Sequence, residues 1–132
     1  MKILNIICKV VLTLLIATPI LGTIGVFPPP TPDMYGNAVA YYFILILMSS
    51  GYVMYTMSVV FLISIFLLWT KREALAAILI LPITINIVGF HAFLDNGLLV
   101  PGAIMGNILL ILNLYFLWMN RKKYLPLLAK SE

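Results

Sequence analysis

His91 and Asp95 are the pair of side chains in this sequence whose types and spacing suit proton transfer. They are four residues apart, about one turn of a helix, so both side chains would lie on the same face. A carboxylate in contact with an imidazole can orient the ring as a proton donor or acceptor at the outer interface. The other interpretation is a capping contact of His91 with Asp95 and Asn96, and the sequence does not choose between the two.

Three polar residues are expected at one depth in the outer half of the apolar segments. Counted from the segment ends at 1.5 Å per residue, Asn86 and Asn107 lie about 10–12 Å from the outer boundary, and Thr18 lies at a similar depth. A polar side chain in lipid needs a partner, so such positions are candidates for function. If these three helix faces point inward, the residues form a hydrogen-bonded outer cluster, and we favour helix-to-helix contact, worth about 0.6 kcal/mol per bond, over ligand binding.

A second polar layer, formed by Lys9, Ser64 and Asn113, is expected about 9–10 Å from the cytoplasmic boundary. The predicted spans contain no Asp or Glu, so we expect no carboxylate of this chain to neutralise the Lys9 ammonium. Lys9 either extends to the cytoplasmic interface near Asn5 or serves as a coupling group. The missing intramembrane carboxylate argues against a proton-coupled transporter.

The composition excludes a soluble enzyme. Of 132 residues, 64% are hydrophobic and 9% are charged, whereas a soluble domain has roughly 25% charged residues, so this chain cannot cover a core with a polar shell. The single cysteine, Cys8, cannot form an intramolecular disulfide, and with a single histidine we expect no metal site. The net charge of +4 comes from short clusters beside the apolar segments, so we expect no nucleic-acid partner.

Four apolar segments are long enough to cross a bilayer as helices, since one crossing takes about 20 residues. We therefore predict an all-α integral membrane protein, a four-helix transmembrane bundle that forms a single domain over residues 1–132. The predicted spans are about 3–27, 51–69, 74–94 and 99–119.

Basic residues set the predicted orientation. Lys2 precedes the first span, Lys71 and Arg72 lie between the second and third, and a cluster from Arg121 to Lys123 follows the fourth. The other two connections contain no Lys or Arg. Because basic residues collect on the cytoplasmic side, we expect both termini in the cytoplasm.

Residues 38–48, AVAYYFILILM, form a further apolar stretch that is too short to cross, since about 11 residues of helix reach only about 16 Å. An additional crossing would also put Lys71 and Arg72 on the side opposite the basic termini. We therefore predict a short outer-leaflet or re-entrant helix between the first two spans, broken at Ser49–Gly51. One long, tilted second span is the alternative.

Two further features bear on ligands and partners. Tyr41 and Tyr42 of the short helix could cover a cavity that opens to lipid, where a quinone or another lipid-soluble molecule would enter. Gly102 and Gly106 form a G-x-x-x-G at the start of the fourth span, which allows close approach to another helix. That helix belongs either to the same chain or to a second copy of it, so the sequence also allows a homodimer.

Nearly the whole chain resembles the DoxX family of small bacterial four-span membrane proteins. The residues that carry the resemblance are Ser-Gly-Tyr at 50–52, PITINI at 82–87, the turn from His91 to Asp95, and Tyr-Leu-Pro at 124–126 within the tail RKKYLPLL. The resemblance implies a compact four-helix bundle with an extra outer segment after the first span, in the bacterial cytoplasmic (inner) membrane. Some members are subunits of a thiosulfate:quinone oxidoreductase or associate with membrane redox complexes.

The second span departs from the family pattern. Ser58 and Phe61 stand where we expect the family to have Lys and Glu, and Ile65 stands where Gly is usual. A role of that charged pair in relatives would therefore not carry over. Lys9 matches a basic position of the family's first span.

We expect a non-catalytic membrane subunit or scaffold that lies in the lipid bilayer, associates with membrane redox partner proteins and has a quinone or lipid pocket. The predicted ligand-binding residues are Asn86, His91, Asn107, Tyr41 and Tyr42. No cofactor is expected to be intrinsic to the chain, because the sequence has no redox centre of its own. Two alternatives remain: a quinone-linked oxidoreductase subunit that uses His91 and Asp95, and a small-solute carrier that uses Lys9.

Overall fold

A computed structural model describes residues 1–130, and within them every regular element is a helix. Four helices are long and apolar enough to cross a membrane: α1 (Lys2–Thr23), α3 (Tyr52–Trp69), α4 (Glu73–Phe93) and α5 (Pro101–Met119). The shorter elements are η1 (Pro32–Met34), α2 (Ala38–Ser50), α6 (Arg121–Tyr124) and η2 (Leu125–Leu128). The predicted all-α four-helix membrane bundle is confirmed.

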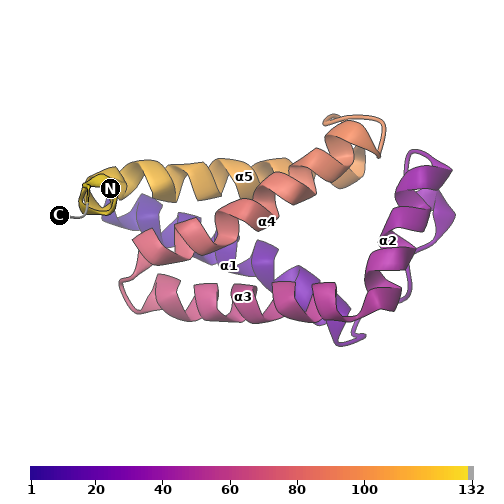
Figure 1. Cartoon of the computed structure of the whole chain (residues 1–132), viewed down its shortest axis with the longest axis horizontal. Coiled ribbons are helices and arrows are strands. Elements are labelled where there is room, and N and C mark those ends of the chain that lie inside the picture. The colour runs from indigo at the N-terminus through magenta and orange to yellow at the C-terminus, as the bar shows by residue number, and fades with distance from the viewer. Residues whose placement is uncertain (131–132) are drawn as a thin grey trace.

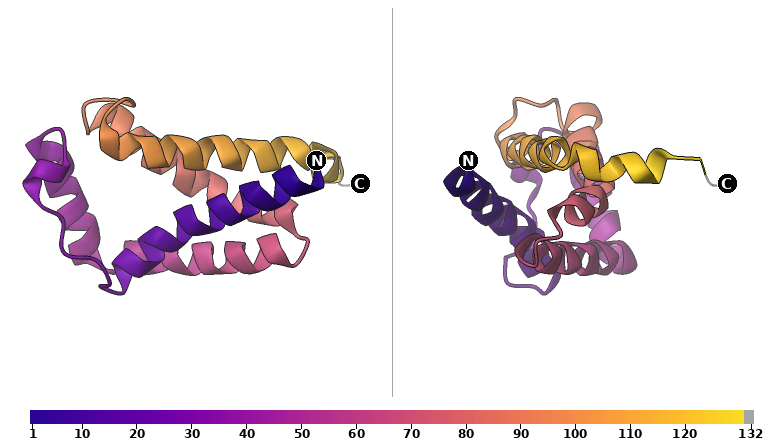
Figure 2. Two further views of the ribbon diagram at one scale, coloured as in Figure 1. Left: turned by 180° about the vertical axis from the view of Figure 1, so that it is seen from behind. Right: turned by 90° about the vertical axis from the view of Figure 1, so that its left-hand side faces the viewer.

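The four long helices run side by side, and the two ends of the bundle differ (Figure 1). The N-terminus, the α3–α4 turn and the C-terminal segment lie at one end, which we call the inner end. The α1–α2 linker, α2 and the α4–α5 turn lie at the other, which we call the outer end. Figure 2 shows the same arrangement from behind and along the bundle. All the clusters of basic residues in the described part of the chain therefore belong to the inner end.

The predicted short helix exists as α2, and it stands at a steep angle to α3 (Figure 1). The break between them is the single residue Gly51, whose φ of +71° lies in the left-handed region that favours glycine. The backbone therefore turns sharply, and α2 and α3 do not form one long tilted span.

The first span ends earlier than its predicted limit at residue 27. Helix α1 stops at Thr23, followed closely by Gly25 with a φ of +81°. The Thr23 hydroxyl donates a hydrogen bond to the Pro19 carbonyl within the last turn, at 2.9 Å. Residues 24–27 therefore belong to the linker that leads to α2.

The core runs along the axis of the bundle and receives side chains from all four long helices. The buried residues of one helix are spaced about one turn apart, as Leu12 and Ile16 are on α1. Helix α4 contributes small residues, which let the neighbouring helices approach closely. The fully buried core members include Leu12, Ile16, Phe61, Leu68, Ala76, Ala77, Ile80 and Phe116.

Large apolar side chains also cover the outside of the bundle. Leu14, Phe66, Ile85 and Ile111 are each between 55% and 64% exposed, and they come from four different helices. A soluble monomer rarely exposes a contiguous apolar patch of more than a few hundred Å², whereas a lipid-facing surface is as apolar as the lipid tails. The chain is therefore a small multi-pass integral membrane protein.

Gly102 and Gly106 of α5 face α4 within the same chain. A Cβ atom at Gly106 would lie 2.9 Å from Cγ2 of Ile87, and one at Gly102 would lie 3.4 Å from Cε1 of His91. The G-x-x-x-G therefore allows close packing of α5 on α4 within one chain. Contact with a second copy of the chain is not needed to explain the two glycines.

Candidate functional site

His91 and Asp95 are in contact at the outer end of α4. Nδ1 of His91 lies 2.7 Å from Oδ2 of Asp95, across the one-turn spacing that the sequence predicts. Asp95 is 1% exposed and the His91 side chain is 12% exposed. A carboxylate this well buried needs several hydrogen bonds, and the contact with the imidazole is one of them.

The second carboxylate oxygen of Asp95 binds the linker that precedes α2. Its Oδ1 accepts a hydrogen bond from the Gly36 backbone amide at 2.6 Å. Asn96 donates from its side chain to the Gly36 carbonyl at 2.6 Å, and Asn37 donates to the Leu94 carbonyl. We call these residues the outer latch: Gly36, Asn37, Leu94, Asp95 and Asn96. The outer latch ties the linker before α2 to the α4–α5 turn and thereby fixes the carboxylate that orients His91.

Asn37 has a second function in the outer latch as the residue that begins α2. Its side-chain oxygen accepts a hydrogen bond from the Ala40 amide at 3.0 Å, the usual arrangement of an asparagine N-cap. Its side-chain nitrogen meanwhile donates to the α4–α5 turn. The start of α2 is therefore held against the turn that contains Asp95.

Aromatic side chains pack between α2 and α4 beside this network. The Phe90 ring contacts Tyr35 edge-on at 6.2 Å and stacks on Phe43 at 5.8 Å, measured between ring centroids. Burial and the nearby negative charge of Asp95 raise the pKa of the Tyr35 phenol, so Tyr35 stays neutral. Tyr41 packs on Tyr35 and Tyr42 at centroid distances of 6.0 and 5.7 Å. Aromatic packing thus supports α2 at the outer end.

A cleft of about 130 Å³ lies between α1, α4 and α5, and His91 is part of its wall. Its lining is mostly apolar, with the His91 imidazole and the Thr18 hydroxyl as the side chains that can form hydrogen bonds. The lining residues are Leu15, Thr18, Pro19, Ile87, His91, Gly102, Met105, Gly106 and Leu109. We call this the His91 cleft.

The glycine pair of α5 lies against the free edge of the His91 ring. A Cβ atom at Gly102 would lie 3.4 Å from Cε1, and one at Gly106 would lie 3.8 Å from Cδ2. These two carbons flank Nε2, the ring nitrogen that does not contact Asp95. When the imidazole is neutral and donates Nδ1–H to the ionised carboxylate, Nε2 presents a lone pair that can accept a hydrogen bond.

The three residues of the predicted outer cluster have no hydrogen bonds to one another. The Thr18 hydroxyl donates to Leu14, the Asn86 side chain to Pro82, and the Asn107 side chain to Leu98, in each case to a backbone carbonyl 2.7–3.0 Å away. Thr18 reaches the wall of the His91 cleft, whereas Asn86 is exposed on the outside of the bundle. Asn86, Asn107, Tyr41 and Tyr42 do not line that cleft.

The buried polar contact between α4 and α5 involves Thr84, which sequence reasoning missed. The Thr84 hydroxyl lies 2.9 Å from Oδ1 of Asn113, and the Asn113 amide donates to the Ala77 carbonyl at 2.9 Å. Thr84 shares a face with Ala76, Ala77 and Ile80, at the helical spacing that the sequence displays. The one-turn spacing of Ala76, Ile80 and Thr84 on one face is the signal that could have identified it.

Ser64 and Asn113, which the sequence places with Lys9 in a second polar layer, form separate local contacts. Ser64 is fully buried and donates to the Val60 carbonyl of its own helix at 2.7 Å. Asn113 bonds to α4 as described above, and the described contacts do not join it to Ser64 or Lys9. The layer is therefore a set of local contacts at similar depth.

The expectation that no carboxylate neutralises Lys9 is wrong. Nζ of Lys9 on α1 lies 2.5 Å from Oε1 of Glu73, the first residue of α4, and both side chains are largely buried, at 12% and 14% exposed. Glu73 lies one residue before the predicted third span, and the long Lys9 stem extends toward the inner interface to reach it. The carrier hypothesis thereby loses the unpaired ammonium on which it was based.

Within residues 1–130, no group of three or more His, Cys, Asp or Glu side chains is placed to hold a metal ion. No family model matches the chain, and no curated protein or solved structure matches it either. The resemblance to the DoxX family therefore depends on the residues quoted above.

Proposed function

We propose that this chain is a DoxX-like, non-catalytic subunit of a bacterial inner-membrane redox complex, and that it holds the ring of a quinone in the His91 cleft. The observation that carries the proposal is the pairing of His91 with the buried Asp95 at the edge of an apolar cleft. Orientation of an imidazole by a buried carboxylate is an arrangement that fixes a hydrogen bond to a third group.

The size and lining of the His91 cleft suit one ring. An engineered apolar cavity of about 150 Å³ in another protein accepts benzene, so a cleft of about 130 Å³ has room for a single six-membered ring. Leu15, Ile87 and Leu109 provide apolar contacts, and the cleft opens on the surface of a bundle that is surrounded by lipid. A quinone ring could enter from the membrane, leaving its isoprenoid tail among the lipid chains.

The polar groups of the cleft match the oxygens of such a ring. Nε2 of a neutral His91 can accept the hydroxyl hydrogen of a quinol, and a protonated His91 can donate to a quinone carbonyl. The Thr18 hydroxyl lines the same cleft from α1; its proton is donated to the Leu14 carbonyl, so its oxygen can accept a hydrogen bond from a second hydroxyl of a quinol. In this proposal the chain binds and orients the ring, and a partner protein exchanges electrons with it.

The cellular placement that goes with the proposal has both termini in the cytoplasm. Its support is the collection of Lys71, Arg72 and the basic residues of the two termini at the inner end of the bundle. The His91 cleft would then lie in the outer half of the membrane.

Photo-crosslinking locates the ligand directly. Purified protein in detergent micelles is irradiated with an azido-quinone analogue, and the modified peptides are identified by mass spectrometry. The proposal predicts modification of α1, α4 and α5 at residues of the His91 cleft, and suppression by an excess of unmodified quinone. Modification confined to α2 around Tyr41 and Tyr42, or labelling that competitor does not reduce, would refute it.

A further inference from the structure

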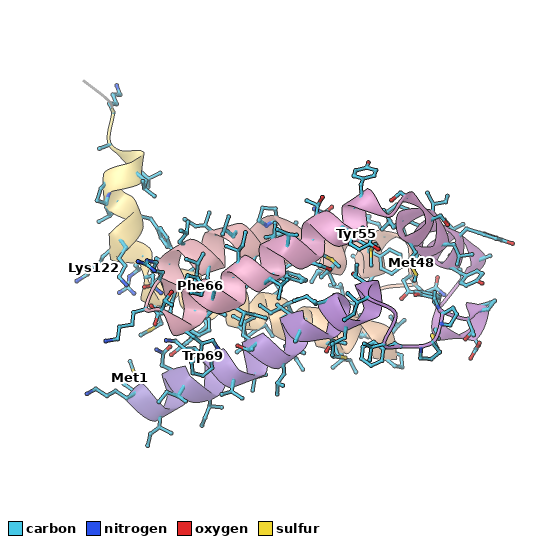
Figure 3. All side chains as sticks on the ribbon, turned by 90° about the horizontal axis from the view of Figure 1, so that it is seen from below. Met1, Met48, Tyr55, Phe66, Trp69 and Lys122 are labelled. Carbon is cyan, nitrogen blue, oxygen red and sulfur yellow. The ribbon has the colours of Figure 1, made fainter. Side chains whose placement is uncertain are left out.

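The chain after α5 leaves the bundle sideways at the inner end. Helix α6 and the 3-10 helix η2 run at a steep angle to the long helices and project beyond them (Figure 2, right; Figure 3, where Lys122 marks the segment). We call residues 121–128 the inner foot. With rises of about 1.5 Å and 2.0 Å per residue in its two parts, the inner foot is about 14 Å long.

Specific contacts hold the inner foot in this direction. The Tyr124 hydroxyl donates to the Ala74 carbonyl in the first turn of α4, at 2.9 Å. Arg121 donates to the Trp118 carbonyl at 2.9 Å, and its guanidinium lies 4.4 Å from the centroid of the Trp118 ring. Asn120, which is 8% exposed, closes the end of α5 by donating to the Phe116 carbonyl. The inner foot is therefore an ordered extension of the bundle.

The inner foot combines basic and apolar side chains that the rest of the protein leaves uncovered. Leu125, Leu127 and Leu128 are 64%, 73% and 79% exposed. Arg121, Lys122 and Lys123 are exposed as well. Exposed leucines beside basic residues, in a segment at a steep angle to the long apolar helices, are typical of a segment that lies at the boundary of headgroups and acyl chains.

Basic side chains outnumber acidic ones in this region of the described chain. Asp33 and Asp95 belong to the outer end, and Glu73, which pairs with Lys9 and also lies within the field of Lys123, is the one acidic residue described at the inner end. Lys71 and Arg72, in the α3–α4 turn, add exposed positive charge at the same end. The positive electrostatic field of these residues attracts an anionic membrane surface.

We propose that the inner foot is an anionic-phospholipid site: its leucines insert among the acyl chains, and Lys122 and Lys123 bind the phosphate groups of phosphatidylglycerol-type lipids. Trp118, which is 67% exposed at the base of the inner foot, lies beside the bound lipids. Each basic residue at an anionic membrane surface contributes about fivefold to lipid preference, so the pair should produce a readily measured selectivity.

Lipid selectivity at Trp118 is the test. The variant Trp69→Phe leaves Trp118 as the single tryptophan, and the full-length protein is reconstituted into vesicles that contain brominated phosphatidylglycerol or brominated phosphatidylcholine. We expect phosphatidylglycerol to be favoured around Trp118 by more than about threefold, as calculated from the quenching, with the preference weakened by high salt. Equal quenching by the two lipids would overturn the proposal.

Two matched double variants separate the inner foot from the general positive field. Lys122→Gln/Lys123→Gln and Lys71→Gln/Arg72→Gln each remove two positive charges from the inner end. The first should reduce the preference at Trp118 to near parity, and the second should leave most of it. Equal losses in both variants would show that the inner foot is no site of its own, which overturns the proposal.

Depth is measured separately, so that charge and insertion are tested apart. Leu127→Cys in a Cys8→Ser background carries a spin label, and its collision rates with oxygen and with a water-soluble nickel complex are compared in the same vesicles. The proposal predicts that oxygen is the more effective relaxant, as it is below the headgroups. A label relaxed mainly by the nickel complex would place the inner foot in water and contradict insertion.

Discussion

Lys9 and Glu73 form an ion pair that joins α1 to the start of α4 at the inner end of the bundle. Both groups are largely removed from solvent, so each would be poorly accommodated alone. The pair explains how a lysine seven residues after the start of α1 can lie in an apolar helix.

Removing one member of this pair should destabilise the fold. Lys9→Met leaves Glu73 without its partner, and Glu73→Gln does the converse; we expect each to lower the free energy of unfolding by roughly 1–3 kcal/mol, because the remaining charge is poorly solvated. The double variant Lys9→Met/Glu73→Gln should recover part of the loss. Denaturant titration in mixed micelles measures all three, and fully additive losses would argue against the pair.

The polar contact of Thr84 with Asn113 should matter more than the exposed Asn86. Asn113→Leu removes the side chain that links the Thr84 hydroxyl to the Ala77 carbonyl, although Thr84 keeps its contact with the Leu81 carbonyl, and should destabilise the protein by about 1–2 kcal/mol. Asn86→Leu, on the lipid-facing side, should be close to neutral. If Asn86→Leu proves the more damaging in the same unfolding assay, the rotation of α4 described above is incorrect.

Gly36→Ala should loosen the outer latch. Its Cβ atom would lie 2.7 Å from Nδ2 of Asn96, so that side chain must move away from the Gly36 carbonyl. We expect faster amide hydrogen exchange over residues 36–40, with the inner end unchanged. Gly89→Ala is the control, because a Cβ atom there meets no atom within 4 Å. Unchanged exchange in Gly36→Ala would mean that the outer latch does not hold α2.

The topology can be tested with single cysteines in a Cys8→Ser background. Lys71→Cys and Ala129→Cys should react with an impermeant maleimide from the same side of the membrane, and Asp33→Cys from the opposite side. This follows from their positions at the two ends of the bundle. Labelling of positions 71 and 129 from opposite sides would rule out an even number of crossings between the two.

The number of long helices and most of their limits were predictable because they depend on local properties of the sequence. A run of about 20 apolar residues defines a span wherever it occurs in a sequence. The end of α2 is likewise local, because it depends on the positive φ of Gly51. Helix α1 ended before its predicted limit for the same kind of reason, since Gly25 adopts a positive φ. The one-turn pair of His91 and Asp95 was equally local.

The partners of the polar side chains were harder to predict. Depth gives the height of a residue along the bundle, but it does not give the rotation of the helix that contains it. Thr84 and Asn86 are two residues apart, about 200° around the helix, so one faces α5 and the other faces outward. The Lys9–Glu73 pair was missed because a long side chain can reach a carboxylate outside the span that contains it.

Equilibrium binding of a short-chain quinone to the purified protein, by titration calorimetry in detergent, tests the proposed function most directly. His91→Phe keeps a ring in the wall of the cleft but removes Nε2, and should weaken binding about tenfold or more, equivalent to about 1.4 kcal/mol for one hydrogen bond. Asn86→Ala, outside the cleft, should bind as the unaltered protein does, with both variants checked for thermal unfolding. No binding by the unaltered protein, or equal affinity in folded His91→Phe, would contradict the proposal.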